Sequence, residues 1–464
     1  MKKIVVLLLV VLMFLSVASV ATANSVPGGP WIHPNQTVKL SSIIQPEELE
    51  QELLAIEARA VEGRMELEQY GVSNHYEWPI YVAKFGDADT DNPKIFIDTQ
   101  IHGDEILGTH AVLNLIREFA TSSQPEVEFI LENVTVWFLP MLNPDGGTIF
   151  EVEHGPGKSL SEATSRRNIQ FWDPEEFDLE EGTPAPWYWA TPGSWGDERR
   201  LCVYDKYEGI GGYDINRDSH PSLVHDLFAH ADYRALDEGY DNDLGNWGGS
   251  PGFRVTPEAR AVRDAFMDLE PCFYINHHHM GTPEKDGEMT TLTIQAQFVP
   301  VVEDPEPGMK GVFQAPWEFE GATYSLHQER LDLSNQVNYL VYDYLTSKYG
   351  GSSPLGNVTQ FPRVEEWNLG WGLPGTTLAS HSMSANYEGG RTGAGVMLYE
   401  VRGQADPWSH TGQKSSGMLI RQSEEALYET LRAFATGEVF DIDPDLFEEE
   451  VPSYGTPASP PWDW

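Results

Sequence analysis

Residues 94–105 read KIFIDTQIHGDE and hold an apolar run followed directly by a polar turn. The run at 94–99 predicts a buried strand, because short apolar runs rich in β-branched and aromatic residues are typical of such strands. Apolar residues recur at helical spacing over 105–120, which predicts a helix after the turn. An imidazole and a carboxylate, His102 and Glu105, therefore lie three residues apart on a strand-to-helix turn, where both can reach one zinc ion.

Working outward, the same patterns predict further elements on both sides of this turn. Strand, helix and strand in this order indicate a βαβ unit and an α/β domain. Two acidic or Asp- and Gly-rich regions, 151–212 and 218–252, interrupt the pattern and are interpreted as long surface insertions. The remaining expected elements are an amphipathic helix at 46–70, strands at 79–85, 134–140, 272–275 and 395–399, and a helical stretch at 323–349.

The N-terminal residues 1–23 have the pattern of a secretory signal peptide. Lys2 and Lys3 precede an apolar run that ends in small residues, Ala21-Thr22-Ala23. The run is shorter than the roughly 20 apolar residues that a membrane-spanning helix needs, and no later stretch reaches that length. We therefore expect a secreted protein, extracellular or periplasmic, without a membrane partner after the signal is removed.

The chain is strongly acidic. It has 29 basic and 72 acidic residues, a net charge of −43, and removal of Lys2 and Lys3 with the signal would make the mature chain −45. Nucleic acid and anionic membranes are poor partners for a protein of this charge, and neither is expected as a partner. Self-repulsion of this size is screened by salt, so stability that rises with salt concentration is expected of a protein adapted to a salty habitat.

The two cysteines, Cys202 and Cys272, are too few for a disulfide framework, so a large apolar core must hold the fold. One disulfide between them and two unrelated thiols are both compatible with the sequence. The last residues, 439–464, combine acids and prolines, and this composition predicts a mobile tail.

Four further segments carry candidate functional residues. They are LPMLNPDG at 139–146, GYDINRD at 212–218, YINHHHMG at 274–281 and LYEVRG at 398–403, and SRRN at 165–168 lies between the first two. In this order, and together with His102 and Glu105, they resemble the M14 zinc carboxypeptidases. The first segment has the composition of a turn, and a structural role is expected for it.

The resemblance implies a three-layer α/β fold, in which a mixed, mostly parallel eight-stranded sheet is flanked by helices. The catalytic domain would span residues 24–438, with the long loop insertions inside it. One zinc ion per chain would be held by His102, Glu105 and a histidine at the end of the strand that begins at 272. Alternate strand residues face opposite sides, so His277 and His279 should share a face that His278 does not.

Two alignments of the histidines are possible within the resemblance. Family members with Asn or Asp two places before the ligand select His278 through Asn276, and an alignment on the apolar strand selects His277; we take His278 as the prediction. Asp214 would accept a hydrogen bond from the ring of His102 and so fix which of its nitrogens faces the metal.

The remaining roles concern substrate. Glu400 would be the general base that takes a proton from the metal-activated water and passes it to the leaving amine. Arg166, with Arg167 as the rival, would stabilise the oxyanion. Asn216 and Arg217 would bind the terminal carboxylate of the substrate, which a guanidinium can hold through two parallel hydrogen bonds. Tyr387 would hydrogen-bond the substrate.

These assignments predict a secreted metallocarboxypeptidase that hydrolyses the C-terminal peptide bond of peptides or proteins with a free C-terminus. One alternative is a zinc amidohydrolase of the same fold that acts on non-peptide acyl-amino acids or on cell-wall peptides. A second alternative is a non-catalytic secreted zinc-binding protein, which the presence of Glu400 disfavours.

Overall fold

The computed structural model describes the secondary structure of most of the chain outside its N-terminus and its long insertions. The described residues are 43–148, 164–169, 201–203, 211–219, 255–280, 284–285, 288–296, 301–303, 310–312, 317–319, 322–350, 353–360, 374–384, 393–403 and 413–453.

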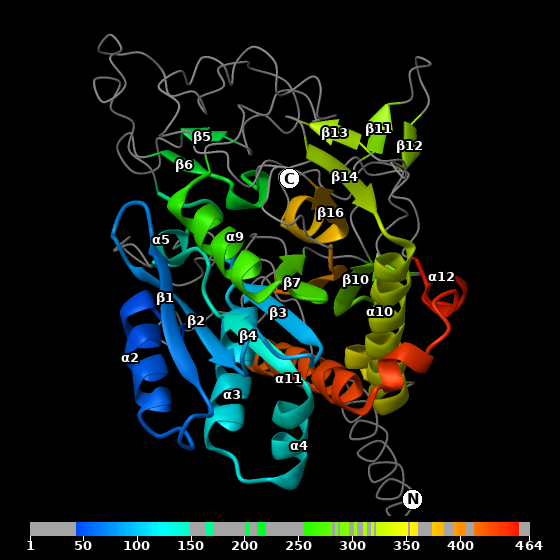
Figure 1. Ribbon diagram of the computed structural model, residues 1–464, viewed down its shortest axis with the longest axis horizontal. Coiled ribbons are helices and arrows are strands. Elements are labelled where there is room, and N and C mark those ends of the chain that lie inside the picture. Colours follow the sequence, from blue (N-terminus) through cyan, green and yellow to red (C-terminus); the bar gives the residue numbers. More distant parts are fainter. Residues whose placement is uncertain are drawn as a thin grey trace, which may run out of the picture.

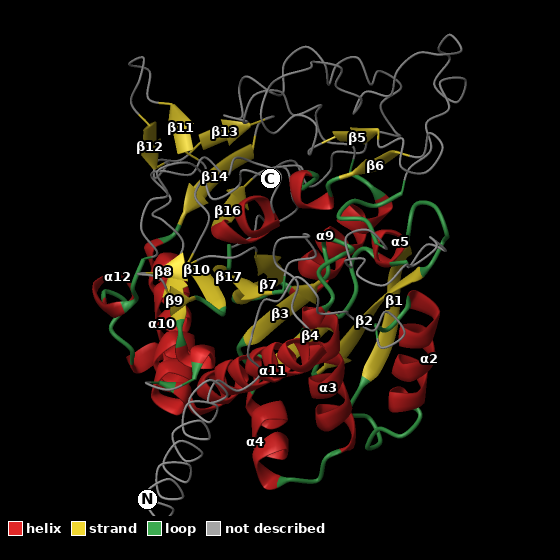
Figure 2. Cartoon of the chain, turned by 180° about the vertical axis from the view of Figure 1, so that it is seen from behind, coloured by secondary structure: helices red, strands yellow, loops and turns green. Residues whose placement is uncertain are grey.

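The centre of the fold is a mixed eight-stranded sheet with the order β1-β2-β4-β3-β7-β17-β10-β15. Figure 1 and Figure 2 together label all of these strands except β15. The four middle strands, β4, β3, β7 and β17, are all parallel to one another, whereas the pairings β1/β2, β2/β4 and β10/β17 are antiparallel. Because the strands β3, β7 and β17 are parallel neighbours, their carboxyl ends meet at one edge of the sheet. The strand bounds are β1 (Glu66–Val72), β2 (Pro79–Phe85), β3 (Lys94–Thr99), β4 (Thr135–Leu139), β7 (Phe273–Met280), β10 (Leu292–Ala296), β15 (Val358–Gln360) and β17 (Gly395–Arg402).

Helices cover both faces of this sheet. One face packs against α2 (Pro46–Glu57), α3 (Leu107–Thr121), α4 (Pro125–Asn133), α10 (Gln328–Tyr349) and α11 (Gln413–Thr436). The other face packs against α9 (Pro257–Leu269), which lies in front of the sheet in Figure 1, whereas Figure 2 shows α3, α4 and α11 from their own side. The α/β three-layer architecture expected from the sequence is confirmed.

Strand residues alternate between the two cores. On β3, Ile95 and Ile97 belong to the core under α3 and α11, and Phe96 belongs to the core under α9. On β7, Phe273 and Ile275 face the first core and Tyr274 faces the second. Every residue of β7 is buried, as expected of a strand covered on both sides. This alternation decides which side chains can reach the α9 face at the end of each strand.

Smaller elements lie outside the main sheet. The predicted insertions fall mostly outside the described residues. The described small elements are α5 (Pro144–Gly147), β5 (Leu201–Val203), β6 (Gly211–Tyr213), η4 (Ile215–Arg217), β8 (Glu284–Lys285), β9 (Glu288–Met289), β11 (Val301–Glu303), β12 (Lys310–Val312), β13 (Trp317–Phe319), β14 (Ala322–Leu326), η6 (Pro354–Gly356), η8 (Gly375–Ser380), β16 (His381–Ser384), η9 (Glu438–Asp441) and α12 (Leu446–Glu450).

Two sequence predictions are wrong near the chain ends. The helix expected over 46–70 ends at Glu57, and residues 66–72 form the edge strand β1. Residues 439–453 are not a mobile tail: they form η9 and α12, and their apolar side chains Val439, Phe447 and Val451 are buried in the core under α10 and α11. Residues 454–464 and the predicted signal at 1–23 lie outside the described part of the chain.

Cys272 is a free thiol. Among the described helices, none has an apolar stretch of the length that a membrane crossing requires.

Candidate metal centre

The turn that carries His102 and Glu105 is held by backbone and side-chain contacts from both sides. Gln100 has a positive φ of 57°, a strained conformation for a residue other than glycine, and its side-chain Nε2 donates to the carbonyl of Gly103 over 2.9 Å. A side chain at Gly103 would meet the backbone of Gly146 at 2.1 Å, so only glycine allows the turn to approach α5 this closely. Asn143, the N-cap of α5, donates from Nδ2 to the carbonyl of Ile101.

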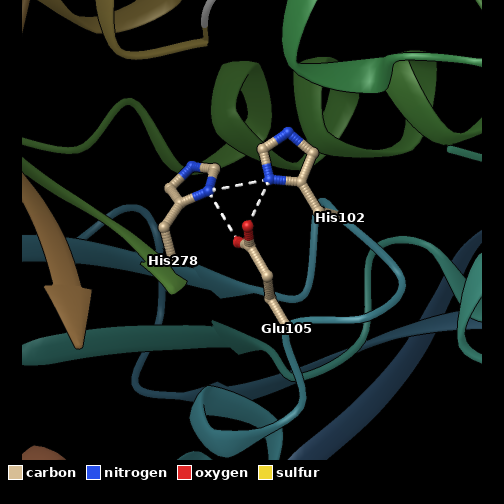
Figure 3. A group of neighbouring side chains, drawn as sticks. All are labelled: His102, Glu105 and His278. Carbon is tan, nitrogen blue, oxygen red and sulfur yellow. Dashed lines mark hydrogen bonds and ion pairs between the residues drawn. The ribbon is translucent and has the colours of Figure 1, made fainter. Parts of the chain in front are cut away.

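The structure brings His102, Glu105 and His278 together at the carboxyl edge of the sheet (Figure 3). The Nδ1 atom of His102 lies 2.8 Å from Glu105 Oε1, and the Nδ1 atom of His278 lies 2.9 Å from Glu105 Oε2. The two Nδ1 atoms are 3.2 Å apart, and all three side chains are almost completely buried. Zinc ligands at roughly 2.0–2.1 Å from a tetrahedral ion lie at similar separations from one another, about 3.4 Å. The three groups therefore fit a metal ion.

The partners of the two rings explain why the cluster suits a cation. Asp214 Oδ1 lies 3.3 Å from His102 Nε2, and the Oδ1 atom of Asn276 lies 2.5 Å from His278 Nε2. An oxygen that only accepts favours a proton on each Nε2, which leaves a lone pair on each Nδ1. Two ring lone pairs and the carboxylate of Glu105 then converge without a donor between them. A cation at this point relieves their repulsion.

The pKa values of the cluster follow from burial and from its mixed charges. Burial lowers the pKa of His278 to about 4, so its ring is neutral at pH 7, the form in which imidazole binds metals. Burial and Arg166 lower the pKa of His102, but Glu105 and Asp214 outweigh them and the net shift is upward. Burial raises the pKa of Glu105, yet the two histidines hold it well below its usual range. Any proton on His102 must leave when a metal binds, so metal affinity depends on pH.

Arg166 lies beside the cluster, on the segment 164–169. Its Nη1 is 3.4 Å from Glu105 Oε1 and its Nε is 3.5 Å from Asp214 Oδ2. Its side chain remains 38 % exposed, so part of it is open to solvent. Burial lowers the pKa of Arg166, but nearby carboxylates, among them Glu400, raise it overall. The arginine is therefore charged and accessible beside the metal cluster.

Glu400 reaches the same side of the sheet. It lies on β17 directly opposite His278 on β7, in parallel register, and it is partly exposed. Neighbouring residues in register point to the same face, so Glu400 and His278 both face the α9 side.

The other predicted residues are placed only in part. Asn216 is buried in η4, and its backbone N–H donates to Asp214 Oδ1 over 3.0 Å. Arg217 ends η4, but its side chain, like the whole of Tyr387, lies outside the described residues. Arg167, the rival of Arg166, is buried.

The neighbouring histidines lie on the opposite side of β7. His277 Nε2 lies 3.0 Å from the hydroxyl of Ser423 on α11, and its ring stacks on Tyr399. His279 Nε2 accepts a hydrogen bond of 2.9 Å from the backbone N–H of Leu107. The predicted division of the three histidines between two faces is thus what the structure shows, with His278 alone at the cluster.

Sequence reasoning missed one polar side chain near the cluster, Asp98. It is fully buried on β3 opposite Asn276 of β7. The signal was present: an acid in the middle of the apolar run 94–99 is unusual, because a buried carboxylate is retained only with partners.

A family model described as zinc carboxypeptidase, peptidase M14, matches residues 53–282. Residues 53–282 are an M14 zinc carboxypeptidase domain. The matched range includes His102, Glu105 and His278 and ends before Glu400.

A carboxypeptidase B from Astacus astacus is 38 % identical to this chain over 63 residues. These residues are 14 % of this chain and 20 % of the relative. The match thus spans about a fifth of that relative's length.

Solved structures of similar proteins share low sequence identity with this chain. Bovine thrombin-activatable fibrinolysis inhibitor in complex with tick carboxypeptidase inhibitor has a TM-score of 0.47 and 13 % identity, with 87 % of this chain and 99 % of that chain covered. Carboxypeptidase A from Helicoverpa armigera has a TM-score of 0.46 and 15 % identity, with 88 % and 76 % covered. The family assignment therefore rests on the family match and the fold on the sheet topology.

Proposed function

We propose that this chain is a secreted, zinc-dependent metallocarboxypeptidase that hydrolyses the C-terminal peptide bond of peptides and proteins. The observation that carries the proposal is the convergence of three buried acceptors, His102 Nδ1, His278 Nδ1 and the Glu105 carboxylate, beside an accessible arginine. These three residues would hold one zinc ion, and the family match supports that choice of metal.

Zinc bound here would polarise the scissile carbonyl and lower the pKa of a water molecule. Glu400 would accept the proton that this water loses and transfer it to the leaving amine, a role for which its partly exposed position opposite His278 is suitable. Arg166 would place its guanidinium against the negative charge that develops on the carbonyl oxygen. Asp214 and Asn276 would keep the protons of the two ligand rings on Nε2.

Recognition of a free C-terminus would come from the segment that follows Asp214. By resemblance to the family, Asn216 and Arg217 would bind the terminal carboxylate, and Tyr387 would hydrogen-bond the substrate. In support, the Asp214 carboxylate contacts both His102 and Arg166 while it caps η4, so η4 begins next to the metal cluster.

The proposal is tested with paired peptides that differ only in a free or an amidated C-terminus. We expect the free acids alone to lose their last residue, with loss of activity after chelation of zinc and in Glu400→Gln. Glu329→Gln, the same charge change at an exposed site on α10, is the matched control and should keep full activity.

Three results would contradict the proposal in different ways. Equal cleavage of amidated peptides would argue against recognition of a terminal carboxylate. Zinc bound without any release of residues would favour the zinc amidohydrolase alternative if acyl-amino acids are hydrolysed, or the zinc-binding protein if they are not. Release that survives in Glu400→Gln would remove the proposed general base.

Export is proposed from the signal-like residues 1–23. The expected result is a protein recovered outside the cytoplasm whose N-terminus begins after Ala23. A full-length N-terminus on the mature protein would contradict export through this signal.

A further inference from the structure

We propose that Asp98 is a positioning residue for the metal ligand His278 and that it acts through the side-chain amide of Asn276. The inference rests on the proposed function, because it concerns a ligand of the proposed zinc ion. In this arrangement Asn276 contacts the ligand His278 directly. Asp98 lies one residue further from the metal and acts through Asn276.

The proposal starts from three hydrogen bonds in one buried chain. Asn276 Nδ2 donates to Asp98 Oδ1 over 2.6 Å, and the hydroxyl of Tyr274 donates to Asp98 Oδ2, also over 2.6 Å. At its other end, the Asn276 amide presents Oδ1 to His278 Nε2. Asp98 and Tyr274 are fully buried and Asn276 is 2 % exposed, so no bulk water competes for these bonds.

Strand geometry places the four residues on one face. Tyr274, Asn276 and His278 are alternate residues of β7, and Asp98 on β3 is the register partner of Asn276. The ring of Tyr274 stacks on Phe96 and packs edge-on against Phe266 of α9. The chain of hydrogen bonds therefore runs along a rigid, covered surface of the sheet and ends at the metal ligand.

The charge of Asp98 decides which way the amide points. An ionised carboxylate only accepts hydrogen bonds, so it holds the NH₂ group of Asn276 toward itself. The reverse orientation would set the amide oxygen against a carboxylate oxygen, two acceptors at hydrogen-bond distance, and is strongly disfavoured. Burial raises the pKa of Asp98 to about 7, and the bonds from Tyr274 and Asn276 oppose this rise. Both donors thus favour the charged form.

The amide orientation in turn fixes the tautomer of His278. With Oδ1 of Asn276 facing Nε2, the ring proton lies on Nε2 and the lone pair lies on Nδ1, toward Glu105 and His102. With the amide reversed, the NH₂ group would donate to Nε2, and the proton would lie on Nδ1 where the metal has to bind. Asp98 thereby excludes a form of His278 that cannot bind zinc.

Asp98→Asn tests this reasoning with little change of shape. An amide at 98 satisfies the chain in both directions, because the Tyr274 hydroxyl can donate or accept. Two arrangements of similar free energy then leave about half of the molecules with the unsuitable tautomer, which weakens zinc binding about twofold through population alone. Loss of the carboxylate's polarising charge adds to this, up to the roughly 10- to 100-fold range typical of residues that support metal ligands.

Two measurements on the full-length chain at pH 8 read out the effect. Competition with a chelator gives the zinc Kd, and ¹⁵N spectra of histidine-labelled protein, after removal of zinc, give the tautomer of His278, assigned by its loss in His278→Gln. We expect one Nε2-protonated form in the wild type, and a mixture with weaker zinc binding in Asp98→Asn.

The matched control is Glu258→Gln, because Glu258 is an equally buried acid on α9 that accepts hydrogen bonds from Asn74 and Asn168 instead. This variant should keep the wild-type Kd and tautomer. Asn276→Ala removes the link itself and should weaken zinc binding about 10- to 100-fold. In that background, Asp98→Asn should have no further effect on the Kd, because residues that act through one chain are not additive.

The outcomes separate this inference from the proposed function. A wild-type chain that binds no zinc would contradict the proposed function. If it binds zinc but Asp98→Asn keeps a single tautomer and an unchanged Kd, the positioning role is wrong. Equal weakening in Asp98→Asn and Glu258→Gln, or the same factor with and without Asn276, also overturns it. If Asp98→Asn does not fold, Tyr274→Phe, which removes one of the two donors to Asp98, is expected to weaken zinc binding, and an unchanged Kd there overturns the proposal.

Discussion

Replacement of Gly108 by alanine is expected to destabilise the protein although it lies inside a helix. Alanine normally stabilises a helix interior relative to glycine by about 1 kcal/mol. At this position on α3, however, a Cβ atom would meet the ring of His277 at 2.5 and 2.9 Å and the Cβ of Thr99 at 2.9 Å. Both neighbours are fully buried. Overpacking of a close-packed core costs about 1–3 kcal/mol, and three contacts under 3.0 Å place this site in the upper half of that range. After subtraction of the gain of about 1 kcal/mol from alanine, we expect a net loss of roughly 1–2 kcal/mol.

Gly417 on α11 is the matched control, because nothing lies within 4 Å of a Cβ atom added there. Gly417→Ala should raise the free energy of unfolding by up to about 1 kcal/mol. Urea unfolding of both variants measures the difference. If Gly108→Ala is as stable as the wild type or more stable, the close approach of α3 to β3 and β7 is not a packing constraint and the reasoning is refuted.

Three further predictions concern charge. Asp214→Asn should weaken zinc binding roughly 10- to 100-fold by chelator competition, because the amide no longer selects the Nε2 proton of His102; an unchanged Kd would argue against this contact. Burial and Asp145 raise the pKa of Glu258 to about 7, above its ordinary value of 4.5, so the native state holds this proton more tightly than the unfolded state. Its contribution to stability therefore falls as pH rises from about 4.5 to 7, and the stability of wild type relative to Glu258→Gln should fall by up to roughly 3 kcal/mol over that window; a constant difference in urea unfolding would contradict this. The net charge of −43 predicts a midpoint of thermal unfolding that rises steadily with salt, and salt-independent unfolding would exclude strong self-repulsion.

The central strands were predictable because both of their faces are buried. Continuous apolar runs marked β3, β4 and the start of β7, and the structure has strands at these positions. The edge strand β1 was missed because its exposure pattern gives it few buried side chains, and its sequence ELEQYGV has no apolar run. Local sequence carries little information about a strand that is defined by its partner β2.

The end of the chain shows where composition misleads. Acids and prolines after residue 439 predicted a mobile tail, but three apolar side chains at spaced positions, Val439, Phe447 and Val451, are enough to fasten this segment to the helical layer. The segment also reaches the main sheet, since Ser453 forms a bridge with Gln360. Average composition cannot report such contacts, because they depend on an apolar surface provided by distant residues.

The metal cluster was predictable only in outline. The turn with His102 and Glu105 could be read from sequence, and strand alternation separates His278 from its neighbours. Which face holds the site depends on the layers that cover the sheet. On one face, Ser423 of α11 contacts His277; on the other, Asp98 and Asn276 lead to His278. These partners lie far apart in sequence, so only the fold assembles them.

The three consecutive histidines link the two segments that carry the proposed metal ligands. His279 accepts the backbone N–H of Leu107 at the start of α3, two residues after Glu105, while His278 itself reaches the cluster from the other face of β7. The same pair of elements is in contact again where Gly108 lets α3 approach His277. The packing of α3 on β7 therefore helps to set the distance between Glu105 and His278. We therefore expect the protein to keep its fold when zinc is removed by a chelator, in contrast to small domains that fold only around their metal, and circular dichroism before and after chelation checks this.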